Sequence, residues 1–117
     1  MIILTIPYPP SVNTYWGFSG HRRFLTPKAV TFKHEVWRIA KQYKTPNLGN
    51  ARLEVTITLH APDKRIRDID NVVKSTLDAL CQANLFLDDS QIDVLTVMRA
   101  EPVKGGKAVV MIEVLPN

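Results

Sequence analysis

The chain has 117 residues, a formal net charge of +4 and 45% hydrophobic residues. That length fits one domain of about 100–200 residues, and such a domain buries a core without disulfides or a structural metal. The single cysteine, Cys81, excludes an internal disulfide framework, and no apolar run approaches the about 20 residues of a membrane span. The N-terminal segment lacks the regions of a signal peptide. We therefore expect a soluble cytoplasmic protein without a membrane partner.

The positive charge is distributed unevenly along the chain. Residues 1–60 hold eight basic and two acidic side chains, whereas residues 61–117 hold seven basic and nine acidic ones. An excess of positive charge suggests a polyanionic partner such as nucleic acid. Carboxylates in such a protein need a separate explanation, because they repel phosphate.

The first part of the chain predicts a strand, a loop and a helix. Alternating apolar residues indicate a strand over 2–6, which prolines end, and residues 11–24 are expected to form a loop. A helix should run from Thr26-Pro27, a good N-cap followed by a residue suited to the first turn, to near Tyr43. Its core-facing side chains recur every three to four residues: Ala29, Phe32, Val36, Ile39, Ala40 and Tyr43.

The second part predicts a strand over 51–60, where apolar and polar residues alternate. A helix follows from about Asp70 to Ala83, with Asp70 or Asn71 as its cap. After a turn at 84–90 come two strands, about 91–102 and 107–115, joined by a hairpin turn at 104–107. The order β-α-β-α-β-β predicts a single α/β domain over 1–117, with a small mixed sheet and two helices on one face.

The chemistry is concentrated at Asp68-Ile69-Asp70 and at Asp88-Asp89. If residue 68 is extended, Asp68 and Asp70 share a face and Ile69 points toward the core. Two such carboxylates suit Mg²⁺, which keeps several waters and is usually completed by substrate phosphate. A third carboxylate from Asp88-Asp89 would complete a metal-nuclease set. Lys74, one helical turn after Asp70, would stabilise developing phosphate charge.

Simpler interpretations exist for each part of this motif. The Asp-x-Asp pair could be a helix cap with surface charge, Asp70 and Lys74 an i,i+4 surface pair, and Asp88-Asp89 ordinary turn residues. Four surrounding basic residues favour a site where phosphate meets metal: Lys64, Arg65, Arg67 and Lys74. No nucleotide-binding loop or zinc-ligand spacing is present.

Distance raises a question about the third carboxylate. A helix from Asp70 to Ala83 is about 21 Å long, and the six residues from Ala83 to Asp89 reach at most about 20 Å. Either the helix is shorter, or Asp89 joins the Asp68/Asp70 pair of a partner subunit. We favour the second arrangement as a hypothesis.

These residues resemble the RusA family of Holliday junction resolvases. The similarity covers nearly the whole chain and rests on the order and spacing of several short motifs: Pro7-Tyr8-Pro9-Pro10-Ser11-Val12-Asn13, the run Asp63–Asn71, Lys74, Leu77-Asp78-Ala79-Leu80, Phe86-Leu87-Asp88-Asp89 and Lys104-Gly105-Gly106. One departure is Ile66, which interrupts a run that is often all Arg or Lys in the family.

The resemblance implies a homodimeric, Mg²⁺-dependent endodeoxyribonuclease that cuts four-way junctions symmetrically in recombination and repair. Asp68, Asp70 and Asp89 look like the family's essential metal-binding carboxylates, and Lys74 looks like its catalytic lysine. The alternatives are a non-catalytic nucleic-acid-binding protein and a nuclease for other branched DNA, such as forks or flaps.

The expected DNA-contacting residues are basic or polar and flank the carboxylates or lie in the early loop: Lys64, Arg65, Arg67, Asn71, Arg22, Arg23, Asn13, Lys104 and Lys107. Phosphate contacts of this kind give affinity without sequence information. Tyr15, Trp16 and Phe18 either stack on exposed bases or pack the loop down, and Arg22-Arg23 either contacts DNA or is a solvated surface.

Overall fold

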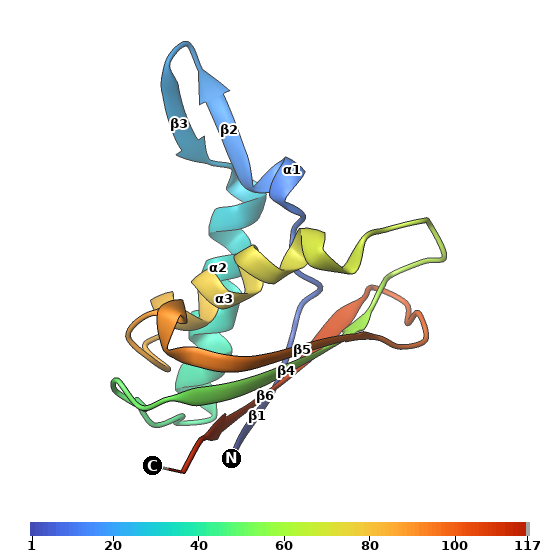
Figure 1. Ribbon diagram of the computed structural model, residues 1–117. Helices are drawn as coiled ribbons and strands as arrows, with labels where there is room; N and C mark the ends of the chain where they lie inside the picture. Colours follow the sequence, from blue (N-terminus) through green and yellow to red (C-terminus); the bar gives the residue numbers. More distant parts are fainter. Residues whose placement is uncertain (117) are drawn as a thin grey trace.

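A four-stranded mixed sheet forms the base of the molecule (Figure 1). Its strands are β1 (Ile2–Ile6), β4 (Leu53–His60), β5 (Ile92–Arg99) and β6 (Lys107–Val114), in the order β1-β6-β4-β5. β6 pairs antiparallel with β1 and β4, and β5 pairs parallel with β4. This computed structural model describes residues 1–116, so Asn117, the last residue of the predicted domain, lies outside the described residues.

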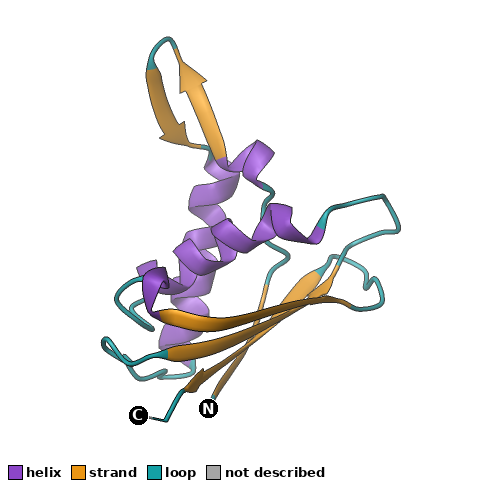
Figure 2. Cartoon of the chain, viewed as in Figure 1, coloured by secondary structure: helices purple, strands orange, loops and turns teal. Residues whose placement is uncertain are grey.

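Side-chain alternation decides which face of the sheet is covered. In β4, Leu53, Val55 and Ile57 are buried while Glu54 and Thr56 between them remain partly exposed. This two-residue period is what a strand with one core face requires. The helices lie on that face alone (Figure 2), as expected.

The long helix α2 (Pro27–Gln42) begins where its local sequence predicts. Thr26 Oγ1 accepts a hydrogen bond from the Ala29 N–H at 3.3 Å, and Pro27 occupies the first helical position. Ala29, Phe32 and Val36 are buried, and Phe32 and Val36 belong to the core cluster shared with the sheet and the neighbouring helix α3 (Val73–Gln82). The helix ends at Gln42 with Tyr43 as its C-cap, close to the predicted end, but Tyr43 is 66% exposed and does not face the core as predicted.

The prediction of a loop over 11–24 is wrong. That segment forms a short helix, α1 (Val12–Tyr15), followed by a two-stranded hairpin, β2 (Trp16–Ser19) with β3 (Arg22–Leu25). The hairpin projects away from the main sheet (Figure 1). Gly20 lies in the turn with φ +62°, a backbone conformation that glycine adopts without a steric cost.

The predicted hairpin between the last two strands is also wrong, because β4 lies between β5 and β6. After β5 the chain stays beside the end of β4, where the Ala100 N–H donates to Leu59 and the Val103 N–H donates to Ala61. Gly105 and Gly106, both with positive φ, then turn the chain toward the opposite edge of β4. Two long strands adjacent in sequence are therefore separated by a third.

The second predicted helix begins later than expected. Ile69–Val72 form a 3₁₀ turn, η1, and α3 starts at Val73, so neither Asp70 nor Asn71 caps it. The first of the last two strands is also shorter than predicted, and residues 89–91 form a second 3₁₀ turn, η2 (Asp89–Gln91). No helix among residues 1–116 has the length and apolar character needed to cross a bilayer.

Candidate active site

Asp68 and Asp70 lie at the start of the segment that leads into α3. Asp68 is extended (φ −84°, ψ 134°), and η1 begins at the next residue. Ile69 packs against the core and Val72 is buried, whereas both aspartates are exposed. The predicted division, with Ile69 inward and the two acids outward, is confirmed.

These two carboxylates are uncompensated. Within residues 1–116 three other aspartates of this region pair with cations, Asp63 with Arg67, and Asp78 and Asp89 with Lys74. Asp68 and Asp70 make no ion pair within that range. Exposed, unpaired carboxylate oxygens two residues apart are the ligands that Mg²⁺ takes when phosphate and water complete its shell, so the residues present fit such an ion.

Lys74 is held by two other carboxylates. Its Nζ lies 3.1 Å from Asp78 Oδ1 and 3.1 Å from Asp89 Oδ2. These contacts raise the pKa of Lys74, so the ammonium keeps its charge at neutral pH. The alternative of an Asp70–Lys74 surface pair does not hold, because Lys74 points forward along α3 to Asp78 instead.

The contact between Lys74 and Asp89 bears on the position of the third predicted carboxylate. Because α3 begins at Val73 and ends at Gln82, it is shorter than the predicted helix, and Asp89 returns to Lys74 of its own chain. Within residues 1–116, however, no three His, Cys, Asp or Glu side chains gather closely enough to hold a metal ion. Asp89 of a partner subunit as the third carboxylate therefore stays a prediction.

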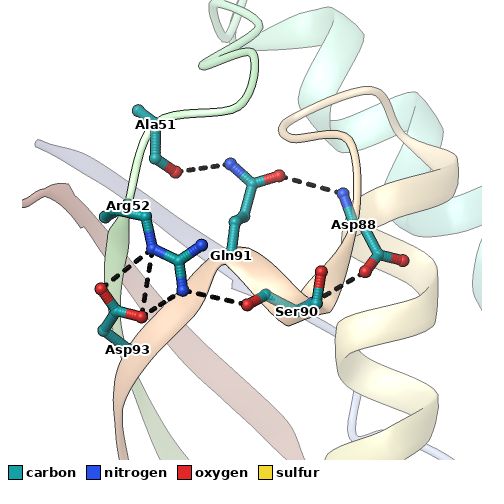
Figure 3. A network of polar contacts seen from close by, with 6 residues as sticks. All are labelled: Ala51, Arg52, Asp88, Ser90, Gln91 and Asp93. Atoms are coloured by element: carbon teal, nitrogen blue, oxygen red, sulfur yellow. Dashed lines mark hydrogen bonds and ion pairs between the residues drawn. The ribbon is translucent and has the colours of Figure 1, made fainter.

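A buried glutamine fixes the turn that carries Asp89 (Figure 3). Gln91 is 5% exposed; its Oε1 accepts the Asp88 N–H at 3.0 Å, and its Nε2 donates to the Ala51 carbonyl at 2.6 Å. Asp88 accepts the Ser90 N–H at 3.0 Å, and hydrogen bonds from the hydroxyl and the N–H of Ser90 lower the pKa of Asp88. The two adjacent aspartates thus have different tasks: Asp88 caps the turn and Asp89 faces Lys74.

The same turn is tied to the sheet from its other side. The Arg52 guanidinium donates to both carboxylate oxygens of Asp93 and, through Nη2, to the Ser90 carbonyl at 3.1 Å (Figure 3). Arg52 precedes β4 and Asp93 lies in β5. The position of Asp89 is therefore linked to the two paired strands of the sheet.

The basic loop before Asp68 contains a constrained and an unconstrained part. Arg67 Nη1 lies 2.8 Å from Asp63 Oδ1, its guanidinium carbon is 5.9 Å from the centre of the Tyr8 ring, and Asp63 raises the pKa of Arg67. Arg65 also contacts Asp63, with 3.6 Å between Nε and Oδ2, but its side chain is exposed. Lys64 is exposed as well, and Ile66 is fully exposed at 101%. The loop holds Arg67 in place and extends the residues before it into solvent.

A groove of about 530 Å³ runs beside Asp68. Its lining includes Arg67, Asn71 and Ser11, the residue before α1, together with Gly105 of the glycine turn and Lys28 of α2. The sequence did not single out Lys28, because nothing local to it shows that the start of α2 faces the loop at 62–72. The groove brings two cations, Lys28 and Arg67, and hydrogen-bonding groups to one of the two unpaired carboxylates.

The remaining predicted DNA contacts are more dispersed. Asn13 is exposed on α1, Lys104 is exposed in the glycine turn whose Gly105 borders the groove, and Lys107 begins β6. Arg22 and Arg23 lie on β3 of the projecting hairpin. The Arg23 guanidinium lies 4.0 Å from the centre of the Trp16 ring.

Tyr15 is part of the site although its hydroxyl was not predicted to be. The side chain is 2% exposed, and its hydroxyl donates to Asp78 Oδ2 at 3.4 Å. Burial and the negative charge of Asp78 raise the pKa of Tyr15 to about 12, so the phenol remains protonated. Of the two alternatives for the early aromatics, packing therefore applies to Tyr15, whereas Phe18 is 72% exposed.

The family model and the individual relatives that match this chain all indicate the same family. A family model described as Endodeoxyribonuclease RusA matches residues 7–115. Crossover junction endodeoxyribonuclease rusA of Enterobacteria phage HK97 is 37% identical over 102 residues, which are 87% of this chain and 85% of that protein. The proteins of the same name from Shigella sonnei (strain Ss046) and Escherichia coli (strain K12) are each 33% identical over 115 residues, 97% of this chain and 95% of each relative.

Proposed function

This chain belongs to the RusA family of endodeoxyribonucleases, and we propose that it is a Mg²⁺-dependent endonuclease that resolves four-way DNA junctions in recombination and repair. The observation that carries the proposal is the pair of exposed, unpaired carboxylates of Asp68 and Asp70, with Lys74 following on α3. An acidic pair inside a chain of net charge +4 is explained if a cation links it to phosphate.

In this proposal Asp68 and Asp70 hold Mg²⁺, with Asp89 as the third carboxylate. The bound ion supplies charge neutralisation at the scissile phosphate and a lowered pKa for a bound water. The Lys74 ammonium stabilises negative charge that develops on the phosphate oxygens. Asp89 contacts the Lys74 ammonium of its own chain at 3.1 Å, which links the third proposed carboxylate to the catalytic lysine.

The groove beside Asp68 is the proposed path of the cut strand. Lys28, Arg67 and Asn71 offer donors to phosphate along it, and the exposed Lys64 and Arg65 extend the positive surface. Contacts to phosphate report the shape of the backbone and not the bases. This favours recognition of a branched structure over recognition of a sequence.

The proposed working unit is a homodimer. Resolution of a four-way junction requires two cuts at related positions, and each chain holds one Asp68/Asp70 pair. A two-fold dimer, the commonest oligomer of soluble proteins, presents two equivalent sites. We propose that it acts in the cytoplasm, where its substrate would be cellular or phage DNA.

Cleavage of synthetic DNA tests the proposal. We expect the wild-type protein to cut a fixed four-way junction in Mg²⁺ and to be inactive in excess EDTA. Asp70→Asn should lower the cleavage rate by at least about 100-fold while junction binding is retained. The control is Glu113→Gln on β6, a carboxylate-to-amide change on the sheet face opposite the helices, which should leave cleavage unchanged.

Each other outcome identifies an alternative. Equal activity of Asp70→Asn would eliminate the proposed site. Tight junction binding without cleavage in any divalent metal would indicate a non-catalytic binding protein. Equal cleavage of three-way junctions, forks or flaps would indicate a nuclease for branched DNA in general.

A further inference from the structure

The Lys74 ammonium has a second carboxylate partner that the proposed metal site does not use. Its Nζ is 3.1 Å from Asp78 Oδ1 and equally far from Asp89 Oδ2. If Asp89 serves as a metal ligand, its negative charge is shared with the cation and its attraction for Lys74 weakens. Asp78 then remains as the carboxylate that keeps the ammonium beside the site.

Asp78 is better placed for this task than an ordinary surface residue. Its side chain is 27% exposed, whereas that of Lys74 is 60% exposed. It lies one turn after Lys74 on α3, the spacing at which two helical side chains meet. An isolated ion pair of this kind contributes little to stability. A second restraint on Asp78 is therefore needed to hold the Lys74 ammonium in one position.

Tyr15 supplies that second restraint. Its hydroxyl donates to Asp78 Oδ2 at 3.4 Å, while Lys74 contacts Oδ1. The carboxylate has a different partner on each oxygen, so tilting it out of this plane weakens both contacts.

The phenol is itself fixed. Tyr15 is buried, and its carbonyl accepts the Thr26 N–H at 3.1 Å. Its ring packs edge-on against Trp16, with 5.3 Å between ring centres.

We propose that Asp78, held by Tyr15, is a positioning residue that fixes the Lys74 ammonium at the catalytic carboxylates. The inference rests on the proposed nuclease function. It assigns to Asp78 and Tyr15 an effect on the rate of cleavage, exerted through Lys74, and none on junction binding. Misplacement of a catalytic group by about 1 Å costs about 100-fold in rate, which sets the expected scale.

Single-turnover cleavage and junction binding, measured separately, test this assignment. Asp78→Asn should lower the cleavage rate by about 10- to 100-fold with the junction Kd unchanged within about twofold. Asp78→Glu, which retains the charge, should recover a substantial part of that loss. Tyr15→Phe keeps the packed ring and removes only the hydroxyl, so it should give a smaller loss of rate with the same Kd.

The matched control is Glu35→Gln. Glu35 pairs with Arg38 at 2.9 Å on the surface of α2, so the change removes a comparable helical ion pair away from Lys74. Cleavage should be unaffected. The urea midpoint of every variant is measured alongside, and if Asp78→Asn does not fold, Tyr15→Phe and Asp78→Glu provide the test.

A double-mutant cycle separates positioning from general damage to the fold. In a Lys74→Ala background, Asp78→Asn should cause no further loss of the residual rate, because the group it positions is gone. An equal loss in both backgrounds would overturn the inference, as would full activity of Asp78→Asn or a loss explained by weaker binding. If the wild type cuts junctions and Asp70→Asn does not, any of these results refutes the positioning role alone.

Discussion

Single side chains in the basic loop differ in how freely they can meet DNA. Arg67 is held by Asp63, with 2.8 Å between Nη1 and Oδ1, so its direction is set before any substrate arrives. Ile66, its neighbour, is fully exposed and has no apolar partner to justify its position. A preorganised cation loses little conformational entropy on binding phosphate, whereas the isoleucine makes no ionic contact there.

Ile66→Arg should therefore strengthen junction binding through charge alone. One added phosphate contact makes the slope of log Kobs against log salt more negative by about 0.9. Binding titrations between about 50 and 200 mM salt measure this slope. The matched control is Ile3→Arg on β1, an exposed position at 54% on the sheet face opposite the helices. A slope that changes equally in both variants, or in neither, would contradict a DNA-facing position for residue 66.

At the scale of elements, the turn that carries Asp89 depends on one buried amide. Gln91 accepts from the backbone N–H groups of Leu87 and Asp88 and donates to the carbonyls of Gly49 and Ala51. Removal of this side chain would leave several backbone groups without partners in a largely buried place. The turn would then lose both its internal cap and its link to the segment before β4.

Gln91→Ala should destabilise the protein by about 2–4 kcal/mol, because each buried polar group left unsatisfied costs about 1–3 kcal/mol. Urea unfolding measures this loss. Junction cleavage should also fall, since Asp89 is no longer held beside Lys74. A stable protein with unaltered cleavage would show that the turn keeps its shape without Gln91.

The Asp93→Asn substitution removes the ion pair of Asp93 with Arg52. Its effect on stability should depend on pH. The Arg52 guanidinium holds the pKa of Asp93 below its ordinary value of 3.8. The stabilisation is therefore complete above pH 3.8 and is lost as the pH falls through the lower folded-state pKa. The wild type and Asp93→Asn should differ in urea midpoint at pH 7 and converge in strong acid. Because both partners are exposed, the difference should be smaller than that caused by Gln91→Ala.

Elements could be predicted from the sequence where the interactions that define them join residues close together in the chain. The α2 helix starts at Thr26 and Pro27 because of interactions within four residues, so its boundaries were correct. The pairing of β5 with β4 depends on strands far apart in sequence, and the turn at 104–107 resembled a hairpin because the intervening strand leaves no local trace. The projecting hairpin was missed because its Gly-rich and basic residues are equally typical of loops.

The same distinction applies to the candidate site. The outward direction of Asp68 and Asp70 followed from their two-residue spacing and was confirmed. The contact of Tyr15 with Asp78 joins residues 63 positions apart, and no periodicity reveals such a pair. The contact of Asp89 with Lys74 of its own chain was not predicted, and the arrangement of Asp89 beside Asp68 and Asp70 of a partner subunit stays a prediction.

At the scale of the whole molecule, one chain offers one carboxylate pair. The described chain measures 44 × 36 × 26 Å, and the sheet leaves β1 and β5 as unpaired edges. Leu95 and Met98 on β5 are 42% and 46% exposed, and an exposed apolar edge strand favours association with another chain. Two copies would carry two sites related by symmetry, which is what paired cuts require.

We therefore expect a dimer by sedimentation, and paired cuts that depend on both sites. A supercoiled plasmid with an extruded cruciform reports this: two cuts within one complex give linear DNA, whereas one cut gives a nicked circle. A mixed dimer of wild-type and Asp70→Asn chains, coexpressed with different tags and purified through both, should yield nicked circles. The wild-type dimer should yield linear DNA. If no mixed complex can be isolated, or if it yields linear DNA as the wild type does, the chains act independently and the dimer is not the working unit.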